Sequence, residues 1–321
     1  MPDQPPVAAL PSPERSPGFA PAGGPAVLSP GRAYLLLAAV VLLWGANWPV
    51  MKVGLGYIPP LSFAAARMAL GAATLFAVLL ASGRFAWPTR RDLPVILSVG
   101  LLQMAAFLAL VSVALLRVDA GRSAILAYTT PLWVWPGAVL LLGERVTRLR
   151  LAGLLLGFAG IATMFNPFGF DWSDGATVTG NGLLMLAAIV WGASILHVRR
   201  HVWRPSPLQL APWQMAAAIP PLLGLALWFE GGTPIRWSGE LAAVLAYNGP
   251  AATAFCFWAA VSVTRALPAI TTSLAFLAVP AAAVAASALT LGEPLTATLA
   301  ASLGLILGGL ALVNLADRRG R

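Results

Sequence analysis

The sequence predicts an all-α integral membrane protein of ten transmembrane helices, arranged as two inverted five-helix repeats. Hydrophobic residues make up 59% of the 321-residue chain and charged residues only 10%, well below the roughly 25% charged residues of soluble domains. Apolar runs of about 20 residues, the length that crosses a bilayer, alternate with short loops. The motifs of the first half also recur in order in the second half.

The two ends of the chain differ from this pattern. Residues 1–31 hold nine prolines among Gly, Ala and Ser and contain no continuous apolar stretch. Such a segment cannot bury enough apolar surface to fold, and it lacks the basic start of a secretory signal. We therefore expect residues 1–31 to form a disordered, Pro-rich cytoplasmic tail, and residues 316–321 to form a short basic cytoplasmic tail.

Ten spans are expected between these tails. Residues 32–165 are predicted to form the first five-helix repeat, residues 166–180 a periplasmic linker, and residues 181–315 the second repeat. Prolines near the expected helix starts, such as Pro60 and Pro207, support the boundaries. The spans are Ala33–Val53, Leu61–Ser82, Leu93–Leu116, Ser123–Leu142, Leu149–Phe165, Asn181–Val198, Leu208–Phe229, Leu241–Val263, Ile270–Leu291 and Leu295–Leu315.

The distribution of lysine and arginine predicts the orientation. With both termini in the cytoplasm, fifteen of these residues lie in inner segments, four lie in outer segments, and Arg67 lies inside a helix. An excess of basic residues marks the cytoplasmic loops. The chain is thus predicted to be a multi-pass protein of the inner (plasma) membrane. The net charge of +9 does not indicate nucleic acid, because the basic residues form no patch.

The internal repeat is read from motifs that Ala- and Leu-rich helices would not share by chance. Shifts of 147 and 149 residues align Trp44-Gly45 with Trp191-Gly192, Arg67 with Gln214, Pro131 with Pro280, and Gly143-Glu144 with Gly292-Glu293. Five spans per half is an odd number, so the second half must lie inverted in the membrane. Inverted repeats place a substrate site near the midplane, between the halves.

These residues carry a resemblance to a known family. Trp44-Gly45 with Lys52, the Pro60–Met68 stretch with Arg67, and the two Pro-x11-Gly-Glu motifs occur in order. On them the chain resembles the EamA-type family of the drug/metabolite transporter superfamily, from about Arg32 to Leu315. The resemblance implies an inner-membrane carrier that exports or exchanges small metabolites, often amino acids or related compounds, without ATP hydrolysis.

Polar and aromatic residues inside the spans are the candidates for substrate binding. A buried Asn or Gln in lipid needs a hydrogen-bond partner, which is either another helix or a ligand. Helix packing is the commoner use of any single residue, but a set drawn from both halves is expected to line a wet cavity. The set is Asn47, Trp48, Gln103, Tyr128, Tyr247, Asn248, Trp258 and Thr272.

A second set is expected to have structural or gating roles: Trp44, Arg67, Pro131, Trp191, Gln214, Pro250 and Pro280. A proline leaves the carbonyl four residues earlier without its donor, so these prolines either shape a kink or offer a carbonyl to a ligand. Arg67 either reaches outward to Asp119 or to neighbouring carbonyls, or it meets a substrate carboxylate. The structural role is favoured, since the family pattern carries an Arg there across varied substrates.

The residues also weigh against other classes of function. Paired Asp, a Ser/His pair or metal ligands do not occur at catalytic depth, and no P-loop occurs, so we expect neither an enzyme nor an ATP-driven pump. Cys256 is the single cysteine, and no metal or cofactor is expected. No span contains an acid, which leaves facilitated diffusion, exchange and proton antiport open.

The expected partners are a small-molecule metabolite and the lipid bilayer, with no nucleic acid. Gly153-x3-Gly157 and Gly304-x3-Gly308 allow close helix approach, and packing within a monomer is preferred over dimerisation, so a monomer or weak homodimer is expected. A non-transporting membrane partner or a lipid scramblase is the alternative function that the residues leave open.

Overall fold

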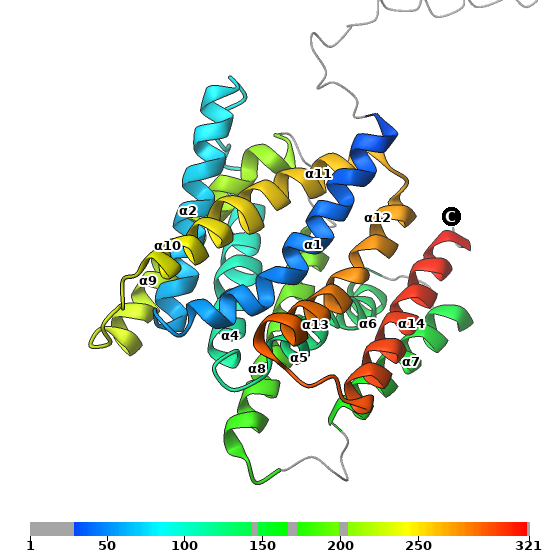
Figure 1. The fold of residues 1–321 in the computed structure, drawn as a ribbon. Coiled ribbons are helices and arrows are strands. Elements are labelled where there is room, and N and C mark those ends of the chain that lie inside the picture. The colour runs from blue at the N-terminus through cyan, green and yellow to red at the C-terminus, as the bar shows by residue number, and fades with distance from the viewer. Residues whose placement is uncertain (1–28, 143–146, 166–171, 199–204, 320–321) are drawn as a thin grey trace, which may run out of the picture.

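The computed structural model describes residues 29–142, 147–165, 172–198 and 205–319. These residues form a helical bundle that contains no β-strand (Figure 1). Eight helical runs among them are long and apolar enough to cross a membrane. The predicted all-α fold is therefore confirmed, while the count of ten spans stays a prediction. The expected disordered tail and the Gly143-Glu144 motif lie almost wholly outside the described residues.

The helices follow one another through the whole described chain. Their bounds are α1 Pro30–Gly54, α2 Pro60–Ala81, α3 Leu93–Ser98, η1 Val99–Ala106, α4 Phe107–Ala114, α5 Ala120–Ala127, α6 Thr130–Leu142, α7 Arg148–Phe165, α8 Gly175–Val198, α9 Pro207–Glu230, α10 Gly239–Ala246, η2 Tyr247–Phe255, α11 Cys256–Ala266, α12 Ala269–Phe276, α13 Ala278–Leu291 and α14 Ala297–Arg319. The segments η1 and η2 are π-helical, and each continues directly from one α-helix into the next.

Proline and capping residues start several helices where the sequence predicts. α2 begins at Pro60 and α9 at Pro207, because the first turn of a helix does not need the missing proline N–H. At α9 the Ser206 N–H donates to Gln209 Oε1 at 2.9 Å, and the Gln209 N–H donates back to Ser206 Oγ at 3.3 Å. This reciprocal capping box fixes the helix start.

Two predicted boundaries are wrong. α8 begins at Gly175 rather than at Asn181, so the end of the predicted linker 166–180 is helical. Asp174 explains the earlier start, because its Oδ1 accepts the Ala176 N–H at 3.1 Å and the Thr177 N–H at 3.2 Å. Hydrogen bonds from Thr177 and Ala176 lower the pKa of the Asp174 carboxyl, which favours the charged cap. At the other end α14 continues to Arg319, into the predicted tail.

The expected third and eighth spans each contain a π-helical segment, which the sequence did not predict. η1 packs against α9 and η2 packs against α2. A Cβ atom at Gly100 of η1 would lie 2.7 Å from the carbonyl oxygen of Gln214, and one at Gly249 of η2 would lie 2.4 Å from the Cβ of Leu70. Both approaches require glycine, since real Cβ contacts are longer. The two segments thus make equivalent contacts in the two halves of the chain.

The expected fourth and ninth spans are broken near their prolines. α5 ends at Ala127 and α6 begins at Thr130, while α12 ends at Phe276 and α13 begins at Ala278. Pro131 and Pro280 lie just inside the second helix of each pair, so the missing N–H falls at the break. The carbonyl of Ala127 accepts the Thr130 hydroxyl at 2.8 Å. The carbonyl freed by Pro131 is therefore already occupied.

Helices from the two predicted repeats pack against each other in pairs. α2 faces α9, α7 lies beside α14, α1 packs on α13, and α8 packs on α6 (Figure 1). The last two contacts correspond to one another under the sequence repeat. Gly153 of α7 closely approaches the backbone of Gly309 in α14, whereas Gly304 has open space around it. The small-residue contact within the monomer is therefore present, but it uses Gly309 in place of Gly304.

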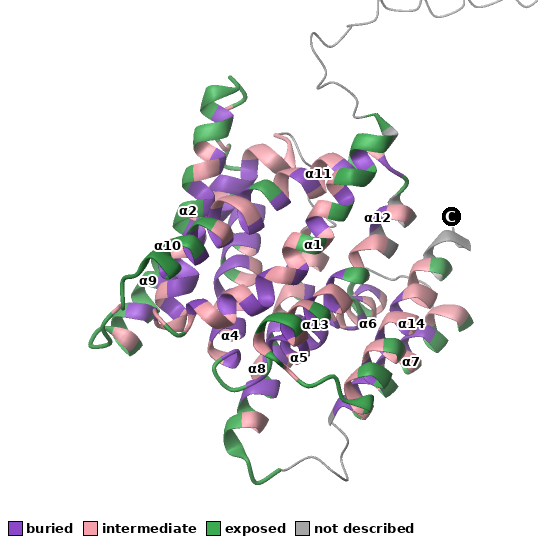
Figure 2. Ribbon diagram, viewed as in Figure 1, coloured by how far each residue is buried: buried purple, intermediate pink, exposed green. Residues whose placement is uncertain are grey.

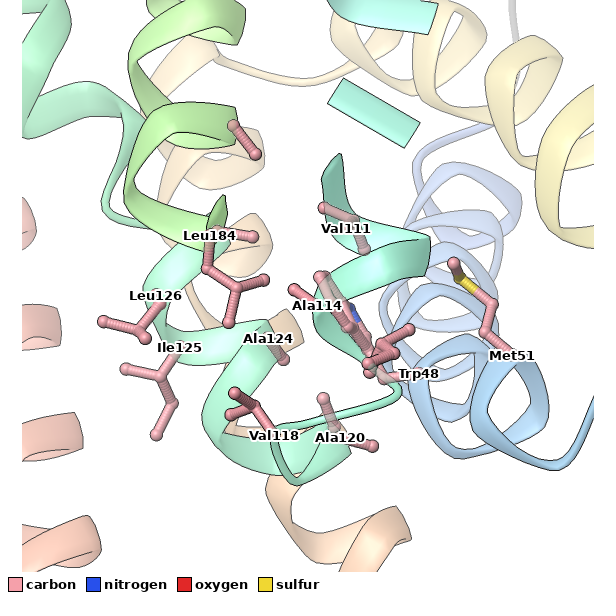
Figure 3. Close-up of a cluster of buried hydrophobic side chains, with 14 of the residues drawn as sticks. Trp48, Met51, Val111, Ala114, Val118, Ala120, Ala124, Ile125, Leu126 and Leu184 are labelled. Atoms are coloured by element: carbon pink, nitrogen blue, oxygen red, sulfur yellow. The ribbon is translucent and has the colours of Figure 1, made fainter. Parts of the chain in front are cut away.

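Buried residues gather in the centre of the bundle (Figure 2). One cluster of buried hydrophobic side chains joins Trp48 and Met51 of α1 to Ala114, Ala124 and Leu184 of α4, α5 and α8 (Figure 3). Large leucines on the outer surface remain exposed, among them Leu140 and Leu289. An apolar exterior around a packed interior is the arrangement expected of a bundle in lipid.

Candidate functional site

Arg67 is the charged residue at the centre of the bundle. It lies on the buried face of α2 with Phe63, Ala64 and Gly71, and only 9% of it is exposed. Its Nε donates to Thr253 Oγ1 of η2 at 2.8 Å, and its Nη1 donates to Met51 Sδ of α1 at 3.2 Å. Both partners are neutral. The arginine therefore joins helices of both predicted repeats without an ion pair.

The expected alternative of an Arg67–Asp119 contact is wrong. Asp119 instead pairs with Lys52, with 3.3 Å between Nζ and Oδ1. Within the described ranges no carboxylate oxygen lies within 4.0 Å of the Arg67 guanidinium, since both ion pairs found there belong to Lys52. The positive charge of Arg67 is thus buried without a balancing acid.

Asn47 shares the acceptor that Arg67 uses. Its Nδ2 also donates to Met51 Sδ at 3.2 Å, one helical turn along α1. Asn47 is buried, and its Oδ1 has no hydrogen-bond partner in the described structure. A thioether is a weak acceptor. The Met51 sulfur nevertheless accepts from both Asn47 and Arg67, while the stronger acceptor, the Asn47 amide oxygen, has no donor among the described residues.

The π-helical segment η2 supplies further polar groups. The Tyr247 hydroxyl donates to the carbonyl of Leu43 at 2.6 Å, and Trp44 Nε1 donates to the carbonyl of Ala252 at 2.9 Å. Asn248 Nδ2 donates to the Val244 carbonyl at 3.2 Å, while its buried Oδ1 has no partner among the described residues. The bonds of Tyr247 and Trp44 tie α1 to η2.

Aromatic rings border these polar groups. Tyr128, at the α5–α6 break, packs edge-on against Trp191 with 6.2 Å between ring centroids, and Trp191 packs against Phe107 at 4.9 Å. Trp44 packs against Phe276 at 5.6 Å. Tyr128 and Tyr247 lie close enough to the Arg67 guanidinium to sense its charge. We call Asn47, Met51, Arg67, Tyr128, Tyr247 and Thr253 the central cluster.

The structure does not bring all predicted site residues into the central cluster. Trp48 lies in the hydrophobic cluster between α1, α4 and α5 (Figure 3). Gln103 in η1 is half-buried, Trp258 packs on Phe255 at 5.7 Å, and Thr272 is buried in α12. Gln214, the counterpart of Arg67 in the repeat, is buried in α9, and its Nε2 has no partner in the described structure. The assignment of these residues to substrate binding or structure stays a prediction.

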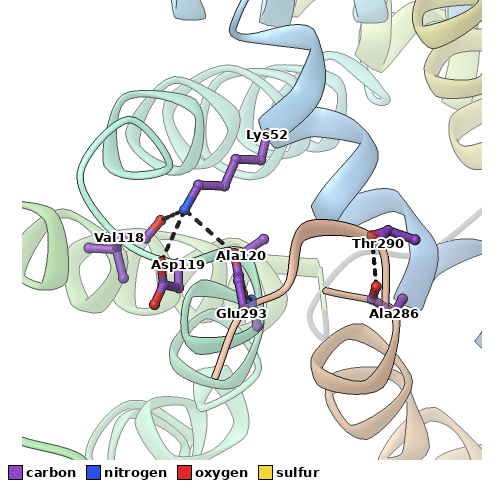
Figure 4. Close-up of polar contacts among 8 residues, drawn as sticks. Lys52, Val118, Asp119, Ala120, Ala286, Thr290 and Glu293 are labelled. Atoms are coloured by element: carbon purple, nitrogen blue, oxygen red, sulfur yellow. Dashed lines mark hydrogen bonds and ion pairs between the residues drawn. The ribbon is translucent and has the colours of Figure 1, made fainter. Parts of the chain in front are cut away.

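A second group of charged residues closes the end of the bundle that holds Lys52. The Lys52 Nζ contacts the Val118 carbonyl at 2.9 Å, Asp119 Oδ1 at 3.3 Å and Glu293 Oε1 at 3.5 Å (Figure 4). Lys52 lies in the last turn of α1, Asp119 precedes α5, and Glu293 follows α13. We call Lys52, Asp119 and Glu293 the Lys52 cluster; it joins both predicted repeats.

Two carboxylates of the second half cap helices of the first half. Glu293 accepts the N–H groups of Ala120 at 2.7 Å and Gly121 at 2.9 Å, at the start of α5. Glu230, the last residue of α9, accepts the N–H groups of Leu61 at 2.7 Å and Ser62 at 2.9 Å, at the start of α2. Carboxylates at these positions satisfy orphan N–H groups and favour the helix dipole.

A groove of about 700 Å³ lies beside this end of the bundle, between α2, α4, α8 and α9. Its lining is mostly apolar and includes Ile58, Leu110, Val113, Leu225 and Phe229. None of the central-cluster residues lines the groove. The groove and the central cluster are therefore separate features.

Sequence reasoning missed three parts of the site. Met51 carries no polar signal, and Thr253 is separated from Arg67 by 186 positions, so neither could be recognised as a partner from spacing. The capping role of Glu293 does have a signal, because Gly292-Glu293 recurs in the repeat. Gly292 takes a positive φ of 68°, which ends α13 and turns Glu293 toward α5.

Comparisons with known proteins agree with this arrangement. The chain matches the EamA-like transporter family twice, over residues 31–166 and again over residues 178–315. The protein of Bacillus subtilis (strain 168) named uncharacterized transporter YvbV is 28% identical over 284 residues, which cover 88% of this chain and 92% of that protein. The probable terminal-alkyne amino-acid exporter of Streptantibioticus cattleyicolor is 29% identical, with 88% and 93% of the two chains covered.

A solved crystal structure has the same fold. It aligns with a TM-score of 0.63 at 24% identity and covers 90% of this chain and 97% of its own. The two family matches together span most of the described helices, including the central cluster and the Lys52 cluster. The chain is a multi-pass membrane protein and belongs to the EamA-like transporter family.

Proposed function

We propose that the chain is a secondary transporter that moves small metabolites, amino acids or related compounds, across the cytoplasmic membrane by efflux or exchange. The observation that carries the proposal is the central cluster. In it, Arg67 and Met51 of the first half meet Thr253 of the second half inside a bundle whose buried residues are mostly apolar. Buried polar groups are costly in a membrane and mark solute pathways in many carriers.

The proposed mechanism is alternating access between two inverted five-helix halves, with both termini in the cytoplasm. The paired packing of α1 with α13 and of α8 with α6 supports it, as do the equivalent π-helical segments. In this arrangement α7 and the broken α12–α13 pair complete the ten spans. The Lys52 cluster then lies on the periplasmic side and holds that side closed. Opening requires Glu293 to separate from Lys52 or from α5.

The substrate class is supported by the relatives. One of them bears a name that describes an amino-acid exporter. The central cluster offers the chemistry such a solute needs, namely a cation at Arg67 and an amide oxygen of Asn47 that has no partner among the described residues. The described spans contain no carboxylate that would relay protons through this cluster, so the proposal includes exchange as a mode of coupling.

The test is solute flux in proteoliposomes that contain the purified full-length protein. A mixture of labelled amino acids and other small metabolites is loaded inside, and exit is followed with and without unlabelled solute outside. Time-dependent, saturable exit above that of protein-free vesicles is the expected result. Fluorescent lipid flipping is measured in the same vesicles. Lipid flipping without solute exit would assign the chain to the scramblases. The absence of both activities would leave the transport proposal without support.

A further inference from the structure

We infer that Arg67, for which the sequence favours a structural role, instead binds the carboxylate of a small organic acid that carries a hydrogen-bond donor on the neighbouring carbon. The inference rests on the proposed transport function and names the group that its central cluster recognises. The residues concerned are Arg67, with its partners Thr253 and Met51, and Asn47 beside them.

The charge of Arg67 is the first argument. A buried guanidinium is always protonated, and burying it without an anion is costly. Its partners in the structure are one hydroxyl and one thioether, which compensate part of the lost hydration and none of the charge. Thr253 and Met51 therefore hold the guanidinium in place, while the charge itself remains available to an anion.

The count of donors is the second argument. A guanidinium has five N–H groups, and the two hydrogen bonds to Thr253 and Met51 use one at Nε and one at Nη1. The remaining N–H groups include both on Nη2, which makes no hydrogen bond to the described residues. A carboxylate is the planar acceptor that fits adjacent guanidinium N–H groups, and the bonds are charge-assisted.

The neighbouring side chain specifies the second half of the ligand. Asn47 Nδ2 and Arg67 Nη1 each lie 3.2 Å from the same sulfur atom, so the two side chains are direct neighbours. The buried Asn47 Oδ1 is an unused acceptor. A donor next to the carboxylate, such as an ammonium or a hydroxyl group on the α-carbon, can bond to this oxygen. The ligand is then an α-amino acid or a 2-hydroxy acid.

Charge balance separates this ligand from a phosphate ester. A phosphate dianion needs more than one cation. Lys52 of α1 cannot serve as the second cation, because it is already paired with Asp119 and Glu293. One unbalanced guanidinium fits one carboxylate. Arg67 is only 9% exposed, so little water competes for its guanidinium, and the low local dielectric strengthens the interaction.

The experiment measures ligand-dependent thermal stabilisation of the full-length protein purified in detergent. The probes are L-leucine, L-phenylalanine, L-threonine and L-lactate, each compared with its carboxamide. We expect at least one free acid to stabilise the protein and its amide to bind about tenfold more weakly or worse, because the amide loses the charge-assisted bonds. This comparison uses the unaltered protein, so it does not depend on the folding of a variant.

Two variants then assign the effect to a residue. Arg67→Gln should reduce affinity for the free acid by about tenfold and leave affinity for the amide nearly unchanged, while Arg67→Lys should retain part of the preference for the acid. The matched control is Gln214→Leu, which removes a buried polar group at the counterpart position in α9. It should change acid and amide affinities by the same factor.

Equal affinity for acid and amide in the unaltered protein would overturn the inference, as would the absence of stabilisation by every acid in the panel. A preference for the acid that survives Arg67→Gln would also overturn it. These outcomes are separate from the vesicle experiment. Saturable flux of solutes without a carboxylate would remove the role of Arg67 and keep the transport function, whereas the absence of flux for every solute would remove the function itself.

Discussion

Trp48 and Gln103 lie in different surroundings, although both are polar or aromatic side chains of the bundle. Trp48 is buried among hydrophobic residues of α1, α4 and α5, whereas Gln103 is half-buried in η1 and makes no hydrogen bond to the described residues. Burial within a packed cluster indicates a structural role. A half-buried amide without a protein partner is available to water or to a solute.

We therefore expect Trp48→Ala to lower the stability of the purified protein by about 3–5 kcal/mol, the usual cost of emptying a large buried site. Gln103→Ala should change stability by less than about 1 kcal/mol and should reduce flux per molecule. Membrane abundance and the thermal midpoint give the first quantity, and vesicle flux gives the second. If both variants lose abundance equally, Gln103 is a packing residue.

Glu293 is a partly buried carboxylate that serves two helices. It is only 12% exposed in its side chain, accepts two N–H groups of α5 and pairs with Lys52. Glu293→Ala should lower stability by about 1.5–3 kcal/mol, because two charge-assisted hydrogen bonds are lost. Asp119→Asn is the control: its side chain is 57% exposed, so less than about 1 kcal/mol is expected. Thermal unfolding in detergent measures both, and equal losses would contradict the capping role.

At the scale of the helices, the two π-helical segments depend on glycines. Gly249→Ala should lower stability by about 1–3 kcal/mol through overpacking against Leu70, and Gly100→Ala should do the same against α9. Gly182→Ala in α8 is the matched control, because no atom lies within 4 Å of its added Cβ. Alanine there should be neutral or slightly stabilising. Helix propensity favours alanine at all three positions, so similar losses in all three variants would show that the close contacts do not set the effect.

The helices were largely predictable because lipid selects long apolar runs, and starts such as Pro60 and Pro207 carry their own signal. The π-helical segments were not predictable. In a mostly apolar run, one extra residue in a helical turn causes no visible change in the pattern of apolar and polar residues. α8 began early because Asp174 caps a stretch of modest hydrophobicity. The break at Tyr128 was not predicted, although Pro131, which lies beside it, was recognisable as a site of distortion.

The site was less predictable than the helices. Arg67 was recognisable as the charge inside a span, but its partners Met51 and Thr253 are set by packing between distant helices. The sequence predicted Trp48 as a cavity residue. A tryptophan beside Asn47 gives the same sequence pattern whether it lines a cavity or packs in a hydrophobic core. Only the direction of each side chain from α1 separates the two roles.

For the whole molecule, the fifteen-to-four asymmetry of basic residues makes a topological prediction. Reporter fusions after Arg91, Arg150 and Arg321 should be cytoplasmic, and fusions near Asp174 and Gly232 should be periplasmic. A phosphatase and a fluorescent-protein reporter at the same positions give complementary signals. A periplasmic reporter signal after Arg321 would exclude both the even number of spans and the inverted repeat.

The carboxylates that cap α2 and α5 also impose an order in time on biosynthesis. The N–H groups of Ala120 and Gly121 receive their acceptor only when Glu293, up to 173 positions later, has left the ribosome. At about 5–20 residues per second, helix ends made early wait roughly 10–35 s for a partner. A first half expressed alone, ending before Gly175, should therefore be degraded quickly, and co-expression of the second half should extend its lifetime. Pulse–chase labelling measures this rescue, and a long-lived first half on its own would show that both helices mature without those late carboxylates.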